Sequence, residues 1–275
     1  MNRYIAVIAL LCLSIAASAQ KYTWKAVPMD GSRSGCRYAM QDDLDEAIGT
    51  IEEGVYTAPS GAEFKKNSVV GKTAALVLDA QAAMAEKKAV IGCSDHEIVE
   101  KKPESELSNL IVDLIMEAAA EASGKPVHMG VLNFGGIRTD LPAGQILLDD
   151  VESMLPFKNY IVYVEHKGSE IRKWIEYMAA TNVQALGGVR LVVEKKKVVS
   201  LEIAGEPLDD DKIYGVATIN FLLNGGDGIS LAENAVSVEN LGILVRQPVI
   251  DHIIKETEAG RMIGYKKDGR VIIRK

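Results

Sequence analysis

The sequence predicts an α+β fold, a mixed α/β domain in which mixed β-sheets are covered by helices. Segments with the two-residue period of strands and segments with the 3.6-residue period of helices intermix without a strict β-α-β rhythm, which favours this class over a doubly wound sheet. With 275 residues and 48% hydrophobic composition, the chain can bury a sizeable core. One large domain and two small ones both fit this length.

The first residues predict a secretory signal peptide over residues 1–19. A short cationic start leads into an apolar run, and Ala-Ser-Ala precedes Gln20 as a cleavage site with small residues. Acylation at Cys12 is disfavoured because Leu11 stands where a lipoprotein signal needs a small residue. We therefore expect a mature chain that begins at Gln20 or Lys21 and is periplasmic or extracellular. No later stretch reaches the roughly 18 unbroken apolar residues of a membrane span.

The exported chain is expected to divide into a lead segment, residues 20–66, and a domain, residues 67–275. The lead segment is rich in Gly, Ser, Asp and Thr, which predicts irregular structure with short strands and turns. Export would permit Cys36 and Cys93 to pair, although a chain of this size does not need a disulfide. No cysteine pair has the spacing of metal ligands.

Periodicity predicts the regular elements of the first half. Apolar residues recur at helical spacing over 69–88, and a short strand follows at 89–95. The most regular pattern is a helix over 104–123, which begins near Ser105 and must pack one apolar face on a sheet. A buried strand over 127–134 comes next.

The second half is predicted to alternate strands and helices. The expected elements are a strand over 160–168, a helix over 169–180, two strands around a lysine turn over 189–205, a strand over 212–223, a helix over 238–256 and a hairpin on Asp268-Gly269 over 264–275.

Charge excludes one class of partner. The net charge is −7 and no basic stripe is present, so nucleic-acid binding has little electrostatic support. Gly-Lys-Thr at 71–73 is not a phosphate loop, because Lys66 stands where that motif requires its first glycine.

Two segments carry candidate binding residues. In the loop over 219–230, Asp227 lies among glycines shortly after Phe221, which fits either a tight hairpin turn or a loop shaped around a ligand. In the segment over 133–138, Arg138 follows a glycine pair at a strand end. An arginine held there can bind phosphate, carboxylate or sugar oxygens through its planar fork, or form an ordinary surface ion pair.

Five motifs occur in a fixed order. They are N-x-G-G-I-R at 133–138, L-x-x-G-x-I at 141–146, L-P-F at 155–157, E-x-x-G at 165–168 and F-L-x-N-G-G-D-G at 221–228. Together they resemble the C-terminal domain of the secreted 5'-nucleotidase family, which includes UDP-sugar hydrolases and ecto-5'-nucleotidases. The helix start at 104–113 is also similar to the family's E-S-x-L-G-N-L-x-x-D, with Ser108 in place of the glycine. The resemblance covers about residues 90–245.

This resemblance implies the family's fold and a nucleotide-binding site. It implies that Phe157 and Phe221 sandwich the base, that Asp227 binds the ribose hydroxyls, and that Asn133 and Arg138 contact substrate. A carboxylate suits a ribose diol because it accepts hydrogen bonds from both hydroxyls. The complete expected set is Asn133, Gly135, Gly136, Arg138, Phe157, Phe221, Asn224, Gly226 and Asp227.

The sequence departs from the family in two respects. Lys101 and Lys102 stand where members often carry an arginine, so a bidentate grip on an oxyanion is lost there. Family enzymes also carry a metallophosphoesterase domain that binds two metal ions. The present sequence contains none of the metal-ligand motifs of that domain. The four histidines are isolated in sequence, and the nearest cluster, at 94–97, is expected to be a solvated loop.

Three functional hypotheses follow. In the first, this chain is the nucleotide-binding subunit of a split enzyme, and a separate metallophosphatase chain holds the divalent metals. The second is an extracellular nucleoside- or nucleotide-binding protein without catalysis. In the third, the pocket has drifted to another ligand or to none. All three predict no catalytic residue, no cofactor and no metal site in this chain, since nothing here would activate a nucleophile for phosphate-ester cleavage.

Overall fold

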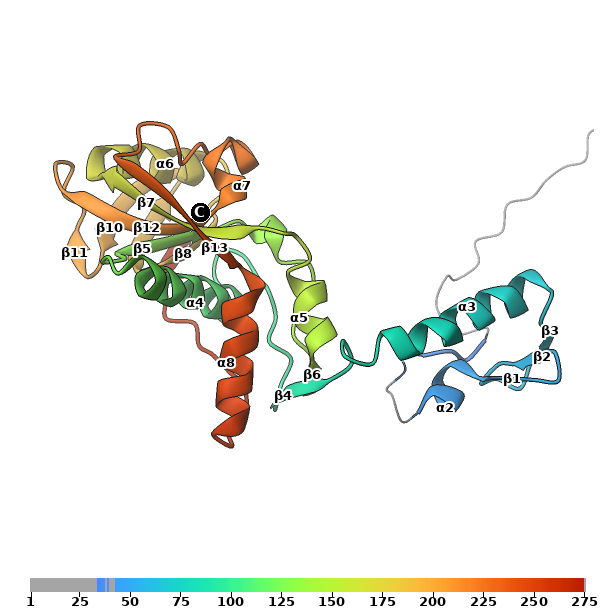
Figure 1. Cartoon of the computed structure of the whole chain (residues 1–275). Coiled ribbons are helices and arrows are strands. Elements are labelled where there is room, and N and C mark those ends of the chain that lie inside the picture. The colour runs from blue at the N-terminus through green and yellow to red at the C-terminus, as the bar shows by residue number, and fades with distance from the viewer. Residues whose placement is uncertain (1–33, 38, 40–42, 275) are drawn as a thin grey trace, which may run out of the picture. The chain divides into compact units, whose positions relative to one another are not determined.

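The computed structural model describes residues 34–37, 39 and 43–274. The predicted signal peptide therefore lies outside the described residues. The described residues form two compact units, which divide between Gln81 and Ala82 (Figure 1). The first unit ends at Gln81 within α3 (Val69–Ala83), and the domain boundary predicted after residue 66 stays a prediction.

The first unit contains a small antiparallel sheet with the strand order β1-β2-β3. Tyr56 in its central strand is buried and stacks on Phe64, with ring centroids 6.1 Å apart. The lead segment, predicted to contain short strands and turns, holds three short strands and one short helix in its described part. The elements are α2 (Leu44–Ile48), β1 (Thr50–Glu52), β2 (Val55–Thr57) and β3 (Glu63–Lys65), and α3 follows the lead segment.

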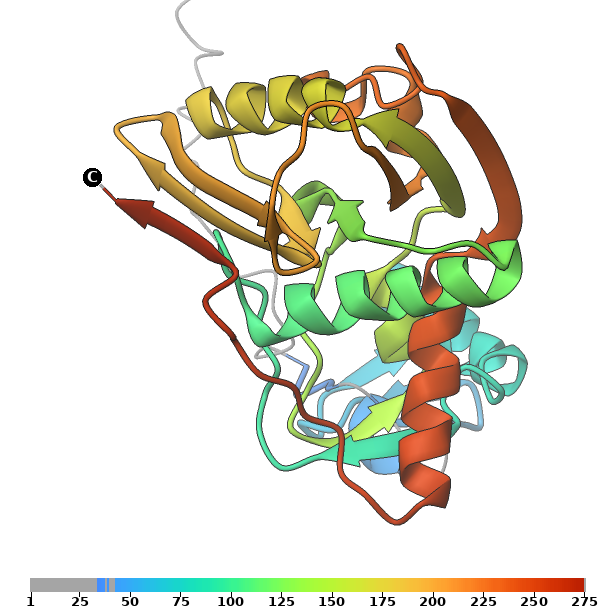
Figure 2. The same ribbon diagram turned by 90° about the vertical axis from the view of Figure 1, so that its left-hand side faces the viewer.

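A five-stranded mixed sheet forms the centre of the second unit, in the order β13-β7-β12-β5-β8. β12 pairs in parallel with β5, and the other pairs are antiparallel. Figure 2 shows α4 across one face of this sheet and α6 on the other. The bounds are β5 (Met129–Leu132), β7 (Tyr160–Lys167), β8 (Ala185–Gly187), β12 (Ile213–Ile219), β13 (Ser237–Leu244), α4 (Glu106–Ser123) and α6 (Gly168–Ala180).

Two smaller sheets complete the second unit. One has the order β11-β10-β9-β14 and the other pairs β4 with β6. Their elements and the helices beside them are β4 (Val90–Ser94), β6 (Gly144–Leu147), α5 (Leu148–Met154), β9 (Val189–Glu194), β10 (Lys197–Ile203), β11 (Glu206–Pro207), α8 (Arg246–Glu258) and β14 (Val271–Arg274). One large hydrophobic core, from Ile98 to Val271, joins all three sheets and the helices of this unit.

The α+β class is confirmed, and α4 begins as predicted. Ser105 caps the helix by accepting a hydrogen bond from the backbone N–H of Ser108, whose hydroxyl in turn accepts from the backbone N–H of Ser105. This reciprocal pair satisfies two backbone donors that a helix start would otherwise leave free. Within the described residues, no helix combines the length and apolar character needed to cross a membrane.

Two predictions near the C-terminus are wrong. The single helix predicted over 238–256 is the strand β13 followed by α8, because β13 pairs along the edge of β7 and that pairing overrides local propensity. The hairpin predicted over 264–275 does not form within the described residues: β14 pairs in parallel with β9, a strand far away in sequence. The strand predicted over 212–223 ends at Ile219, and a helical turn follows.

Candidate functional site

Three loops meet at one edge of the five-stranded sheet. Because β5 and β12 are parallel, the segment from Asn133 and the segment from Asn220 leave the sheet at the same edge. β7 runs antiparallel to β12, so Phe157, which lies just before β7, reaches that edge as well. These loops carry all nine residues predicted to bind substrate, and parallel strand ends are a common place for ligand sites.

Direct contacts confirm that the three loops are neighbours. Phe157 and Gly136 line one small hollow together with Leu132 and Ile219, the last residues of β5 and β12. The side-chain oxygen of Asn220 accepts a hydrogen bond, 2.9 Å long, from the first backbone N–H of β7. The site edge is therefore held together by both packing and hydrogen bonding.

The loop after β5 places a buried acceptor at this edge. Asn133 is 5% exposed and precedes the short 3-10 helix η2 (Phe134–Gly136). Its Oδ1 is buried and has no hydrogen-bond partner within the described residues. The backbone N–H of Phe134 donates to Gln184, which fixes the loop from the side of β8. An unpaired buried acceptor is unusual in a folded protein, and a ligand that donates a hydrogen bond would satisfy it.

Arg138 lies exposed at the end of this loop. Its backbone N–H donates to the Met154 carbonyl at 2.9 Å, and its guanidinium donates to the Gly135 carbonyl at 3.2 Å. It forms no ion pair with any acid in the described part of the chain, so a surface ion pair does not account for it. Asn224, which follows α7 (Asn220–Leu223), is exposed as well.

Both predicted aromatic residues lie outside the core. Phe157 is 49% exposed and Phe221 is 44% exposed, although phenylalanine is usually buried. A core role for either ring is therefore excluded. Whether the two rings hold a base between them stays a prediction.

The glycine-rich loop is not a hairpin. It consists of α7 and the short 3-10 helix η3 (Gly226–Gly228). A Cβ on Gly226 would lie 2.6 Å from the Phe221 ring, and a Cβ on Gly228, whose φ is +77°, would lie 2.2 Å from the Tyr177 hydroxyl oxygen. The loop thus passes between two aromatic rings where no side chain fits. Asp227 stands between these glycines at a φ of +51°.

Asp227 presents a free carboxylate at this edge. The residue is exposed, and its side chain makes no hydrogen bond or ion pair to any residue that the structure describes. Its left-handed backbone conformation is uncommon for a residue with a side chain, and such strain is frequent at binding sites.

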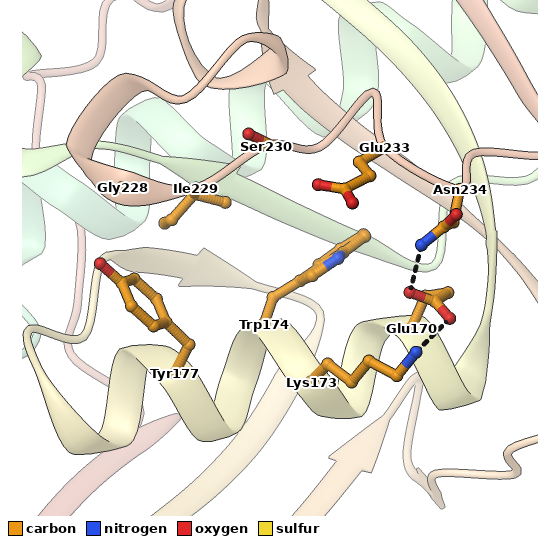
Figure 3. Close-up of a pocket in the computed structure, with 9 residues that line it drawn as sticks. All are labelled: Glu170, Lys173, Trp174, Tyr177, Gly228, Ile229, Ser230, Glu233 and Asn234. Atoms are coloured by element: carbon orange, nitrogen blue, oxygen red, sulfur yellow. Dashed lines mark hydrogen bonds and ion pairs between the residues drawn. The ribbon is translucent and has the colours of Figure 1, made fainter.

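Two residues outside the nine predicted ones lie beside these loops. Lys102 places its Nζ 5.4 Å from the centroid of the Phe134 ring, so a cation lies next to η2. Tyr177 reaches Gly228 from α6 (Figure 3). The family pattern marks the lysine, because members often carry an arginine there, although the predicted binding set does not include it. No local signal marks Tyr177, because its contact lies 51 positions along the chain.

Comparison with known proteins now fixes the family. Residues 47–234 match the family described as "5'-nucleotidase, C-terminal domain", which is more than half of the chain. The chain belongs to the 5'-nucleotidase C-terminal domain family. A solved 5'-nucleotidase precursor from Thermus thermophilus superposes with a TM-score of 0.65 at 27% identity, over 74% of this chain and 43% of that one.

Curated relatives of this C-terminal domain are longer proteins. Protein UshA of Yersinia enterocolitica is 34% identical over 149 residues, which cover 52% of this chain and 27% of that protein. Protein UshA of Escherichia coli is 30% identical over 163 residues, 58% of this chain and 29% of that protein. The chain therefore spans less than a third of these relatives.

Two motifs of the C-terminal domain family have structural roles here. Glu165 accepts hydrogen bonds from Ser237 and Tyr163 at the opposite end of β7 from Phe157. Glu104 is buried and accepts from Asn109 and from the backbone of residues 268 and 269. These motifs hold the sheet and the C-terminal segment in place, and they do not reach the candidate site.

The described residues of this 5'-nucleotidase C-terminal domain do not fit a metal centre. No group of three or more His, Cys, Asp or Glu side chains among residues 34–37, 39 and 43–274 is arranged to hold an ion. The two ring nitrogens of His96 are instead hydrogen-bonded to carboxylate oxygens, Nδ1 to Asp95 at 2.5 Å and Nε2 to Glu106 at 2.8 Å. The thiols of Cys36 and Cys93 are both free.

Proposed function

We propose that this chain is an exported nucleotide- or nucleoside-binding domain. In this proposal it is the substrate-binding subunit of a nucleotide-hydrolysing enzyme, and a separate metallophosphatase chain supplies the divalent metals. One observation carries the proposal: two exposed phenylalanines, Phe157 and Phe221, lie at adjacent strand ends on the edge that also carries the free carboxylate of Asp227. Aromatic faces bind bases by stacking, and a carboxylate accepts hydrogen bonds from a ribose diol.

The polar groups of the same edge support this ligand. The unpaired Oδ1 of Asn133 would gain a partner from a base or sugar donor, which would offset a desolvation cost of about 1–3 kcal/mol. Arg138 and Lys102 provide cations for phosphate oxygens. A relative that matches over this domain is named 5'-nucleotidase, which agrees with a nucleotide ligand.

The alternative is an extracellular nucleoside- or nucleotide-binding protein that performs no chemistry. It uses the same residues, so binding experiments alone do not separate it from the first proposal. Hydrolysis on mixing with a metallophosphatase encoded beside this chain would support the split enzyme. Export is supported by the predicted signal peptide and by the resemblance to secreted enzymes.

Calorimetric titration with adenosine and with free adenine tests the site. We expect adenosine to bind more tightly, and Asp227→Asn to remove most of that difference while leaving adenine unaffected. Arg138→Lys should weaken AMP more than adenosine, by on the order of 1–3 kcal/mol, because lysine lacks the bidentate fork.

If the chain binds neither adenosine nor uridine, and neither of their monophosphates, the proposed nucleotide site is refuted. If Asp227→Asn changes the affinities for adenosine and for adenine equally, Asp227 is not part of the nucleotide site. A thermal-shift series with nucleotides and nucleotide sugars then identifies the preferred base.

A further inference from the structure

A second hollow lies behind the Asp227 loop, between α6 and residues 228–234 (Figure 3). Trp174 and Tyr177 line it from the helix, and Ser230 and Glu233 line it from the loop. None of these residues belongs to the predicted substrate-binding set. We propose that this hollow is a separate binding site for a neutral polyhydroxylated ligand, such as a sugar.

Contacts between the helix and the loop hold both ends of the hollow. At one end the Glu170 carboxylate accepts from Lys173 at 2.6 Å and from Asn234 at 3.2 Å. At the other end the backbone of Gly228 packs against the Tyr177 hydroxyl. The loop is thus fixed to α6 on both sides of the hollow, so the space between them is part of the folded structure.

An aromatic surface forms the floor. Trp174 is only 9% exposed, and its ring meets the buried His166 ring edge-on, with centroids 4.4 Å apart. This packing fixes the orientation of the indole. Tyr177 adds a second, more exposed ring, and Ile229 adds aliphatic surface. Rigid aromatic faces bury the apolar face of a ligand at a low cost in side-chain entropy.

Three residues that line the hollow carry polar groups without partners. The hydroxyls of Tyr177 and Ser230 and the carboxylate of Glu233 make no side-chain hydrogen bond to the described part of the chain. Figure 3 shows the Glu233 carboxylate pointing into the space above Trp174. By contrast, Glu170 on the same wall is already paired. The free groups are therefore available to a ligand.

The chemistry of these groups selects the ligand class. A carboxylate only accepts hydrogen bonds, whereas hydroxyls both donate and accept, and the hydroxyls of a sugar match both kinds. A phosphate or carboxylate ligand would be repelled by the unpaired carboxylate of Glu233, whereas Glu170 is neutralised by Lys173. An ammonium ion could pair with Glu233, but it has no acceptor for the hydroxyl protons of Ser230 and Tyr177. The combination favours a neutral polyol ring.

The test uses Trp174 as its own reporter. The chain has two tryptophans, so Trp24→Phe leaves Trp174 alone. We expect its emission to change saturably with D-glucose, D-galactose or N-acetyl-D-glucosamine, with a dissociation constant of about 0.1–10 mM, the weak range typical of a small polar ligand. Glu233→Gln should weaken binding about tenfold, since it replaces charge-assisted hydrogen bonds with neutral ones. The matched control, Glu258→Gln at the end of α8, should leave binding unchanged.

Calorimetry on the unaltered chain repeats the titration without any substitution, in case Trp24→Phe impairs folding. The proposal would be overturned if none of the three sugars gave a saturable response. It would also be overturned if Glu233→Gln bound the sugar as tightly as the unaltered chain. Saturation by inorganic phosphate or by spermidine instead would also overturn it, in favour of a charged ligand. Because the readout does not involve a nucleoside, these results are independent of the nucleotide-binding experiments.

Discussion

At the scale of single residues, Phe157 and Phe221 give the sharpest test, because both residues are nearly half exposed. We expect Phe157→Ala and Phe221→Ala each to lower the affinity for adenosine about tenfold to a hundredfold, since base stacking contributes about 1–3 kcal/mol per ring. Melting temperatures should change little, because neither ring belongs to the core. Calorimetry and thermal melts on the same samples check both parts.

Two further variants make this prediction specific. Phe221→Trp retains a stacking face and should preserve affinity. Phe64→Ala, which removes a partly buried ring stacked on Tyr56, should lower stability and leave adenosine binding unchanged. Unfolding of Phe221→Ala without loss of affinity in the folded fraction would contradict a stacking role.

Gly228 is the second residue with a testable role. We expect Gly228→Ala to weaken riboside binding, because the new Cβ would approach the Tyr177 hydroxyl and displace the backbone that holds Asp227. Gly205→Ala is the matched control: its φ is +83°, but no atom lies within 4 Å of the added Cβ. Both variants carry backbone strain of about 1 kcal/mol or more, and only the first should lose affinity. Equal losses in calorimetric affinity would show that crowding by Tyr177 has no role.

At the scale of elements, α6 and β7 meet through a buried histidine. Burial lowers the pKa of His166, although its Nε2 lies 2.7 Å from the Leu231 carbonyl oxygen and Glu170 lies nearby. With a folded pKa below the ordinary value of 6.5, the unfolded chain binds the proton more readily. The contribution of neutral His166 to the stability of the fold is therefore fully present above pH 6.5 and is lost as the pH falls through the folded pKa.

We accordingly expect the free energy of unfolding to decrease as the pH is lowered below 6.5. His166→Gln, which keeps a donor for the Leu231 carbonyl, should reduce this slope in urea titrations at several pH values. His128 should retain part of the slope, because burial lowers its pKa too. An unchanged slope in His166→Gln would remove His166 from the pH dependence.

The C-terminal segment is joined to α4 by a buried ion pair. The guanidinium of Arg270 donates to both carboxylate oxygens of Asp113 at 2.7 and 2.8 Å and also binds Asp268. We expect Arg270→Met to destabilise the protein by about 3 kcal/mol in urea unfolding, because it leaves the partly buried Asp113 carboxylate with the Tyr265 hydroxyl but without a cation. Arg261→Met breaks only an exposed pair with Glu256 and should cost about 1 kcal/mol or less. Similar losses in the two variants would contradict a structural role for the buried pair.

At the scale of the whole molecule, the candidate site lies in a chain whose described residues hold no metal-ligand cluster. We expect purified residues 20–275, supplied with Mn²⁺, Co²⁺ or Zn²⁺, to hydrolyse no nucleotide above background, since two-metal sites supply the nucleophile in such reactions. Phosphate release from AMP and UDP-glucose provides the measurement. Metal-dependent turnover that a single substitution in this chain abolishes would contradict the split-enzyme proposal.

Much of the fold could be predicted because its signals are local. The Ser105 cap and the apolar face of α4 lie within one continuous segment, and the alternation in β7 reports burial directly. The hairpin predicted on Asp268-Gly269 failed for the opposite reason. Asp-Gly is a common turn dipeptide, but the partner of β14 lies about 80 residues earlier in β9, and no local pattern encodes a parallel pairing.

The sequence by itself determined the α+β class, the family and the identity of the nine candidate residues, because motif order and periodicity are properties of the linear chain. Only the tertiary structure decided that their three loops meet at one sheet edge, since this depends on the parallel pairing of β5 with β12 and the antiparallel pairing with β7. It also decided that Phe157 and Phe221 are exposed and that Tyr177 packs against Gly228. Exposure and contact depend on what the rest of the chain places around a residue, and short-range sequence patterns do not carry that information.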